Sequence, residues 1–256
     1  MKRANLLALC GIIGAIGIAI GCTPTAFNSI APPPENALRV GTYNVHYIIL
    51  RKQSGAWSVG DWDRRKGPLD QAFKALGADL VGFQEMESFG GRSGTDTNLT
   101  LDWLLAQNAG YAAAAVGDPA VFPSTQPILF RTDRLALLDQ GWFFFSDTPD
   151  VIYSRTFNGS YPAFASTAQF RDLTSDKVFR VVNVHFEYKS MSNRSKSASL
   201  VAERIQPVVS DGEPVILVGD TNAFSFFPTM RTLKSIPLTL AAPDGPTFHL
   251  NRGIEL

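Results

Sequence analysis

Four apolar segments of this chain end in polar residues that a hydrophobic core cannot use. Asn44 follows "GTY", Glu85 follows "LVGFQ", His185 follows "VVNV", and Asp220 and Asn222 follow "VILVG". Gathered at one place, carboxylates, amides and an imidazole can bind a hard cation, activate a water molecule and protonate a leaving group. Each residue alone has an ordinary explanation as a turn former, a helix cap or a satisfied core residue. The coincidence of four such segments in one chain favours an active site.

The apolar segments that carry these residues are rich in β-branched and aromatic side chains, which predicts strands. Because the polar residues come at the carboxyl ends of strands, we expect their side chains to converge on one rim of a sheet. The predicted strands span residues 38–45, 79–85, 127–131, 179–188 and 214–222.

Two helices are predicted between the strands, over residues 61–77 and 197–212, where apolar side chains recur at helical spacing. Gly77 is expected to end the first helix, and Pro68 makes its first turn uncertain. In the second helix Pro207 predicts a kink or an early end.

Residues 163–186 predict an antiparallel hairpin around the turn "TSD". Hairpins combined with crossover helices indicate an α+β or mixed α/β fold and not an all-parallel sheet. From Leu38 onward the sequence contains no repeat, low-complexity tract or linker, so we expect one domain.

The amino terminus has the pattern of an export signal. Lys2 and Arg3 precede an apolar run over residues 6–20, which is short for a transmembrane span of about 20 residues. The run closes on "AIGC", which ends at Cys22 and resembles a bacterial lipobox. The alternative is an ordinary signal peptide with an incidental cysteine. We predict a lipoprotein signal peptide over 1–21, a proline-rich spacer over 22–37, and the folded domain over 38–256.

These features predict an exported monomer, held to a bacterial membrane on its extracytoplasmic side through a lipidated Cys22. The other cysteine, Cys10, lies inside the predicted signal, so the mature chain would form no internal disulfide. Removal of Lys2 and Arg3 leaves 21 basic against 23 acidic residues, a net charge of −2. That balance argues mildly against processive binding of duplex nucleic acid.

In their order and spacing the four motifs resemble the endonuclease/exonuclease/phosphatase superfamily, which includes nucleases, sphingomyelinases and inositol-polyphosphate phosphatases. The matching segments are "TYNVH", "FQEME", "NVHFEY" and "GDTNA", and the resemblance runs from Leu38 to the end of the chain. It implies a four-layer αββα sandwich, with two mainly antiparallel sheets flanked by helices. Residues 126–150 also resemble the family's middle segment, a pair of strands followed by a Ser-x-x-Pro turn.

The resemblance implies a metal-dependent phosphoesterase that hydrolyses a phosphodiester or phosphomonoester of a nucleic acid, a phospholipid or a sugar. Asn44 and Glu85 would contact the metal, and their hard oxygens suit Mg²⁺ or Mn²⁺ better than zinc. Asp220 would orient or deprotonate the attacking water, and Asn222 would donate to the phosphate. His185 would donate to a phosphate oxygen or protonate the leaving group. The alternative from another class is a non-catalytic surface lipoprotein that uses the same sandwich as a binding module.

Several further residues allow two interpretations. His46 and His249 either line the cleft or are merely residues at its rim. Lys189, Arg194 and Lys196 follow His185 closely and form either a solvated helix start or a clamp for a phosphorylated substrate.

Two motifs that the resemblance requires, an Ile-Asp-x-Ile-like strand and a terminal Ser-Asp-His, are missing from the sequence. The chain stops on "PTFHLNRGIEL", where the first of them would be expected to begin. Three explanations account for the missing motifs: the chain is an incomplete copy of a longer enzyme, it is a non-catalytic relative, or its terminal motif has been replaced. The intact motifs favour the first, and we expect the 256-residue chain itself to be weakly active or inactive.

Overall fold

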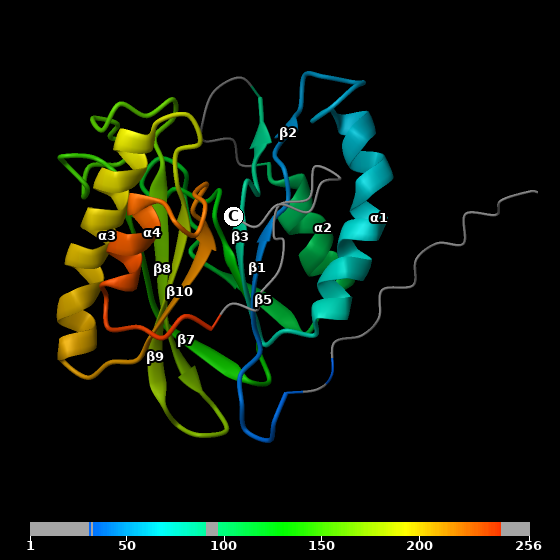
Figure 1. Ribbon diagram of the computed structural model, residues 1–256. Helices are drawn as coiled ribbons and strands as arrows, with labels where there is room; N and C mark the ends of the chain where they lie inside the picture. The colour runs from blue at the N-terminus through cyan, green and yellow to red at the C-terminus, as the bar shows by residue number, and fades with distance from the viewer. Residues whose placement is uncertain (1–30, 32, 91–96, 242–256) are drawn as a thin grey trace, which may run out of the picture.

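Two four-stranded sheets pack face to face in the computed structural model, which describes residues 31, 33–90 and 97–241 (Figure 1). The first sheet has the order β1 (Val40–Asn44), β3 (Leu80–Gln84), β6 (Ile128–Arg131), β5 (Tyr111–Ala114). The second has the order β10 (Val215–Asp220), β9 (Val178–His185), β8 (Phe164–Asp172), β7 (Leu135–Phe144). A short parallel pair, β2 (Ile48–Ile49) with β4 (Ser88–Phe89), lies beside the first sheet.

Helices cover the outer face of each sheet. The first sheet carries α1 (Val59–Leu76) and α2 (Leu99–Gln107), and the second carries α3 (Met191–Ser210) and α4 (Pro228–Lys234), on opposite sides of the molecule (Figure 1). In each sheet one pair of strands is parallel, β1 with β3 and β10 with β9, and the other pairs are antiparallel. The predicted α+β fold, a four-layer αββα sandwich with mainly antiparallel sheets, is confirmed.

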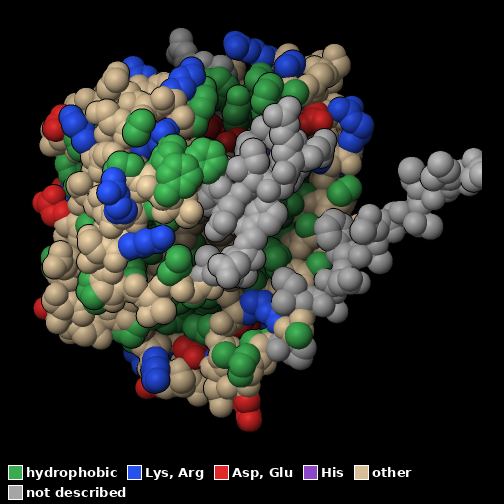
Figure 2. Space-filling view, viewed as in Figure 1, with side chains coloured by type: hydrophobic (Ala, Val, Ile, Leu, Met, Phe, Trp, Pro, Cys, Tyr) green, Lys and Arg blue, Asp and Glu red, His purple; other side chains and the backbone are tan. Residues whose placement is uncertain are grey.

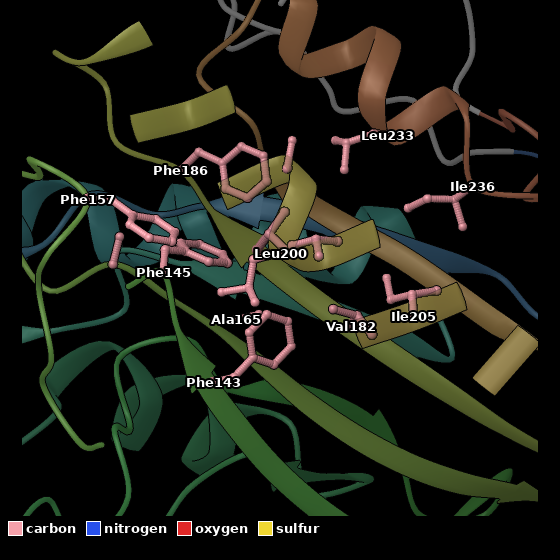
Figure 3. Close-up of a cluster of buried hydrophobic side chains, with 14 residues drawn as sticks. Phe143, Phe145, Phe157, Ala165, Val182, Phe186, Leu200, Ile205, Leu233 and Ile236 are labelled. Atoms are coloured by element: carbon pink, nitrogen blue, oxygen red, sulfur yellow. The ribbon is translucent and has the colours of Figure 1, made fainter. Parts of the chain in front are cut away.

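Three clusters of buried apolar side chains fill the three interfaces between these layers. Figure 3 shows the cluster beneath α3 and α4, in which Phe145, Phe186 and Leu200 meet between helix and sheet. A second cluster lies beneath α1 and α2, around Phe73 and Phe83. Burial of this apolar surface is the main favourable contribution to folding.

A buried polar network joins the two sheets directly beneath the ends of their strands. Gln84 Nε2 donates to Asn183 Oδ1 at 2.7 Å, and Asn183 Nδ2 donates to the Phe83 carbonyl at 2.8 Å. Gln126 Nε2 adds a bond of 3.2 Å to the Asn183 carbonyl. At Gly82 any side chain would collide, because a Cβ would lie 2.7 Å from Val218 Cγ2. The sheets therefore approach too closely here for an ordinary residue.

All five strands predicted from the sequence form, with ends within three residues of those expected. α1 runs through Pro68 and ends before Gly77, and α3 extends one turn beyond Pro207. α3 also begins earlier than predicted, because the Ser190 side chain caps it by accepting from the Asn193 N–H. The short elements β2, β4, β5, α2 and α4 were not predicted.

The middle segment departs from expectation. Both of its strands form, but β6 pairs with β3 and β5 in the first sheet, whereas β7 pairs with β8 in the second. The expectation that they pair with each other is wrong, because residues 132–134 carry the chain from one sheet to the other. The predicted turn follows β7, where Ser146 Oγ accepts from the Thr148 N–H at 3.1 Å.

Several predictions fall outside the described residues. These are the signal peptide over 1–21, the lipidated Cys22, the role of His249 and the terminal segment over 246–256. Among the helices of the described ranges, none is both long and apolar enough to cross a membrane.

We predict that Gly219→Ala destabilises the protein severely, by about 3 kcal/mol or more. A Cβ at Gly219 would lie 2.0 Å from the Val184 carbonyl oxygen, and the residue has a φ of +139°. Urea denaturation followed by circular dichroism measures the loss. Gly212→Ala is the matched control, because Gly212 has a φ of +86° with open space around it and so tests backbone strain without collision. Equal losses in the two variants would contradict the packing argument.

Candidate active site

The polar residues singled out in the sequence converge because each sheet contains one parallel pair. Asn44 lies opposite Gln84 in the register of β1 and β3, and His185 lies opposite Asp220 in β9 and β10. The carboxyl ends of parallel strands meet at one edge, and the two sheets bring these edges together. The predicted convergence is thus a feature of the fold.

Asn44 links the two sheets at this edge. Its amide Nδ2 lies 3.1 Å from Glu85 Oε1 and 3.1 Å from Asp220 Oδ2. Its Oδ1 accepts from the His46 N–H at 3.1 Å. A neutral amide therefore separates two carboxylates that would otherwise repel each other.

His185 is almost enclosed, with 8% of its surface exposed, and its Nε2 lies 3.8 Å from Glu85 Oε1. The ring of Tyr161 lies beside it, with 5.8 Å between the ring centroids. Tyr161 donates its hydroxyl to the Phe186 carbonyl at 3.1 Å, and burial raises the pKa of this phenol well above its usual value. Tyr161 therefore stays protonated and positions the imidazole without itself serving as a base.

Two hydrogen bonds to residues earlier in the chain hold Asn222 in place. Its backbone N–H donates to Asp220 Oδ1 at 2.9 Å, and its side-chain Nδ2 donates to the Phe186 carbonyl at 2.9 Å. An amide group carries two N–H donors, so one is left for a ligand. Its role as a phosphate donor stays a prediction.

These side chains line a single cleft of about 2150 Å³, together with His46, whose side chain is 65% exposed. Backbone strain gathers around this cleft. Its lining includes five of the described non-glycine residues with positive φ: His46, Trp57, Glu85, Tyr153 and Asn222. Such conformations cost of order 1–3 kcal/mol each and persist where the surrounding structure imposes them, often at functional sites.

Among the described residues of the cleft wall, five charged ones were not singled out from the sequence: Arg65, Glu87, Asp102, Asp118 and Arg155. Glu87 is largely buried, and burial together with the nearby Glu85 carboxylate raises its pKa to about 7. Arg65 of α1 donates to the carbonyls of Val45 and His46 and so holds the loop after β1. The only available signal was the "E-x-E" spacing of Glu85 and Glu87.

The basic residues after His185 do not form a clamp. Lys189 lines the cleft and is exposed, whereas Arg194 is buried and donates to the carbonyls of Glu187 and Tyr188 at 2.8 and 2.9 Å. Lys196 lies over the ring of Phe157. Neither interpretation of the sequence describes Arg194, because its guanidinium is a structural donor that fixes the chain after β9.

The donor atoms at the centre of the cleft fit a hard divalent cation. Among the described residues no group of three or more His, Cys, Asp or Glu side chains is arranged to hold a metal ion. Glu85 and Asp220 nevertheless both lie within hydrogen-bonding distance of the Asn44 amide, so two carboxylates and an amide are close together. The carboxylate oxygens suit Mg²⁺ or Mn²⁺, and Asn44 Oδ1, which accepts from the His46 N–H, is a further hard oxygen at this edge.

Comparison with known proteins bears on the resemblance to the endonuclease/exonuclease/phosphatase superfamily. No family model matches the chain. A protein of Acanthamoeba polyphaga mimivirus is 29% identical over 168 residues, which are 64% of this chain. The match spans 60% of that relative, less than two thirds of its length.

Three solved structures from Bacteroides share the fold. An endonuclease/exonuclease/phosphatase from Bacteroides vulgatus is 24% identical, with a TM-score of 0.64 over 77% of this chain and 70% of that one. The mannosyl-6-phosphatase of Bacteroides thetaiotaomicron is 23% identical, with a TM-score of 0.65 over 78% and 70%. A family protein from the same species is 25% identical, with a TM-score of 0.63 over 77% and 68%. The resemblance predicted from the motifs is confirmed, and the chain has the fold of the endonuclease/exonuclease/phosphatase superfamily.

Proposed function

We propose that this protein is a metal-dependent phosphoesterase, which hydrolyses a phosphodiester or phosphomonoester bond. The observation that carries the proposal is the meeting of Asn44, Glu85, His185 and Asp220 at one edge of the sandwich, within one cleft. Two carboxylates, an amide and a buried imidazole are the groups that phosphate-ester hydrolysis requires. The fold shared with the mannosyl-6-phosphatase supports the same reaction class.

In this proposal Glu85 and Asn44 hold Mg²⁺ or Mn²⁺, which polarises a phosphate oxygen when bound. Asp220 orients the attacking water and accepts its proton. The water oxygen bonds to phosphorus as the bond to the leaving oxygen breaks, and His185 gives that oxygen a proton. His185 lines the cleft with only 8% of its surface exposed, and its Nε2 lies 3.8 Å from Glu85 Oε1. The free N–H of Asn222 donates to the phosphate without adding negative charge.

The catalytic assignment predicts that Glu85→Gln and Asp220→Asn each lower kcat/KM about a hundredfold or more. The assay follows hydrolysis of bis(p-nitrophenyl) phosphate and p-nitrophenyl phosphate by the protein translated to the natural stop codon of its gene. EDTA should abolish turnover, and Mg²⁺ or Mn²⁺ should restore it. Asp118→Asn is the control, because Asp118 is an exposed acid of the same cleft. Turnover insensitive to EDTA and to both variants would refute the proposal, and its complete absence would favour the non-catalytic binding module.

The cation site predicts a second effect, on stability. Asn44→Asp places a third carboxylate between Glu85 and Asp220, so we expect a loss of about 2 kcal/mol of unfolding free energy in EDTA. Millimolar Mg²⁺ should recover that loss, because the cation neutralises the added charge. Urea denaturation with and without Mg²⁺ measures both. Asn158→Asp makes the same charge change at an exposed residue outside the cleft lining. Equal behaviour of the two variants would show that these donors do not bind a cation.

We also propose that the protein is exported and anchored through a lipidated Cys22, on the strength of the "AIGC" pattern. Cys22→Ser should abolish incorporation of labelled palmitate and move the protein from the membrane fraction to the soluble extracytoplasmic fraction. Cys10→Ser is the matched control, because it changes a cysteine inside the predicted signal. Unchanged labelling of Cys22→Ser would exclude this anchor.

A further inference from the structure

One wall of the cleft carries a flat aromatic surface that the proposed chemistry does not use. The rings of Tyr47 and Trp57 are almost parallel, 8° apart, with 6.1 Å between their centroids. Parallel aromatic rings at such a separation are in the range of favourable aromatic pairs. Both residues line the cleft, and Trp57 remains 39% exposed. We call Tyr47 and Trp57 the aromatic shelf.

The shelf is held in place by strained and hydrogen-bonded neighbours. Trp57 has a φ of 59° and His46 a φ of 57°, and both are left-handed conformations that bulky residues rarely adopt. The Trp57 indole Nε1 donates to His46 Nδ1 at 3.3 Å, and Arg65 donates to the His46 carbonyl at 2.8 Å. Holding an exposed tryptophan in a left-handed backbone conformation costs free energy. Burial in the apolar core does not offset that cost, because the ring remains partly exposed. Such strain is typical of ligand-binding positions.

The shelf lies next to the proposed phosphate site. The backbone N–H of Tyr47 donates to Glu85 Oε2 at 3.4 Å, and His46 Nδ1 is 4.0 Å from the same oxygen. If a cation held at Glu85 binds the phosphate, as in the proposed function, the shelf is within reach of the organic substituent of the ester. The volume of the cleft leaves room for a substituent much larger than the phosphate group.

The charges around the shelf favour an uncharged substituent. Among the described residues that line the cleft, five are acidic and three are basic, and one of the basic residues, Arg65, already donates to backbone carbonyls. A polynucleotide needs cations along its backbone and is disfavoured here. Carboxylates instead accept hydrogen bonds from hydroxyl groups, and the C–H face of a sugar ring packs on the negative face of an aromatic ring.

We propose that the aromatic shelf binds the sugar ring of the substrate, and that the substrate class is a phosphorylated monosaccharide. This inference rests on the proposed function for the position of the phosphate. It assigns Trp57 and Tyr47 to specificity and leaves bond cleavage to the residues at the strand ends.

Calorimetry tests the shelf without turnover. In Mg²⁺ and on an Asp220→Asn background, which keeps the ester uncleaved, the dissociation constants of mannose 6-phosphate, glycerol 3-phosphate and adenosine 5′-monophosphate are compared. We predict that Trp57→Ala weakens binding of mannose 6-phosphate about tenfold and that of glycerol 3-phosphate less than about twofold. Trp57→Phe should retain most of the affinity. Phe226→Ala, which removes an exposed aromatic ring outside the cleft lining, should change neither.

Equal weakening for both small phosphates, or no weakening, would overturn the proposal, and so would an equal effect of Phe226→Ala. The shelf would be assigned to a nucleobase instead if adenosine 5′-monophosphate bound more tightly than mannose 6-phosphate and its binding were weakened equally by Trp57→Ala. In the hydrolytically active protein, Trp57→Ala should raise KM for mannose 6-phosphate with kcat nearly unchanged. A protein that binds the sugar phosphate through Trp57 but hydrolyses no ester would refute the proposed function and leave the shelf standing.

Discussion

The buried hydrogen bonds that Gln84, Asn183 and Gln126 make between the two sheets fix how the sheets sit on each other. The Gln84 and Asn183 side chains are almost completely buried; they bond to each other, and Asn183 also donates to the Phe83 carbonyl of the opposite sheet. A slip of one sheet along the other would leave these groups unpaired inside the core, which costs about 1–3 kcal/mol for each group. Glu85 follows Gln84 directly, and His185 comes two residues after Asn183, so the same bonds fix the separation of the two site residues.

Fixed strand ends explain how the site is placed, and the strained residues beyond them explain how its side chains are aimed. Glu85, directly after β3, and Asn222, two residues after β10, both have left-handed backbone. The parallel pairing continues one residue past each pair of strands, since Val45 donates to the Gln84 carbonyl and Phe186 to the Asp220 carbonyl. The cost of the left-handed turns is offset by this pairing and by the packed layers beneath it.

The features that the sequence predicted are those determined by local pattern. Apolar runs mark the strands, and polar residues at their ends identify the candidate site. Pattern does not specify which strand pairs with which, so the separation of β6 and β7 into different sheets could not be read from it. Nor could the burial of Arg194, whose neighbours in sequence are polar but whose guanidinium donates to the carbonyls of Glu187 and Tyr188. The surroundings of Trp57 and Glu87 form only when loops that are separate in the sequence come together in the fold.

The charge of the cleft bears on how a phosphate ester could bind there at all. Glu85, Glu87 and Asp220 surround the place where the ester would react, and the guanidinium of Arg65 is occupied by backbone carbonyls. The remaining cations of the described lining, Arg155 and Lys189, are exposed and therefore well hydrated. A negatively charged ester entering this cleft meets net repulsion unless a bound cation reverses it. On the proposed function, the hard oxygens of Asn44 and Glu85 are therefore needed for substrate binding as well as for chemistry.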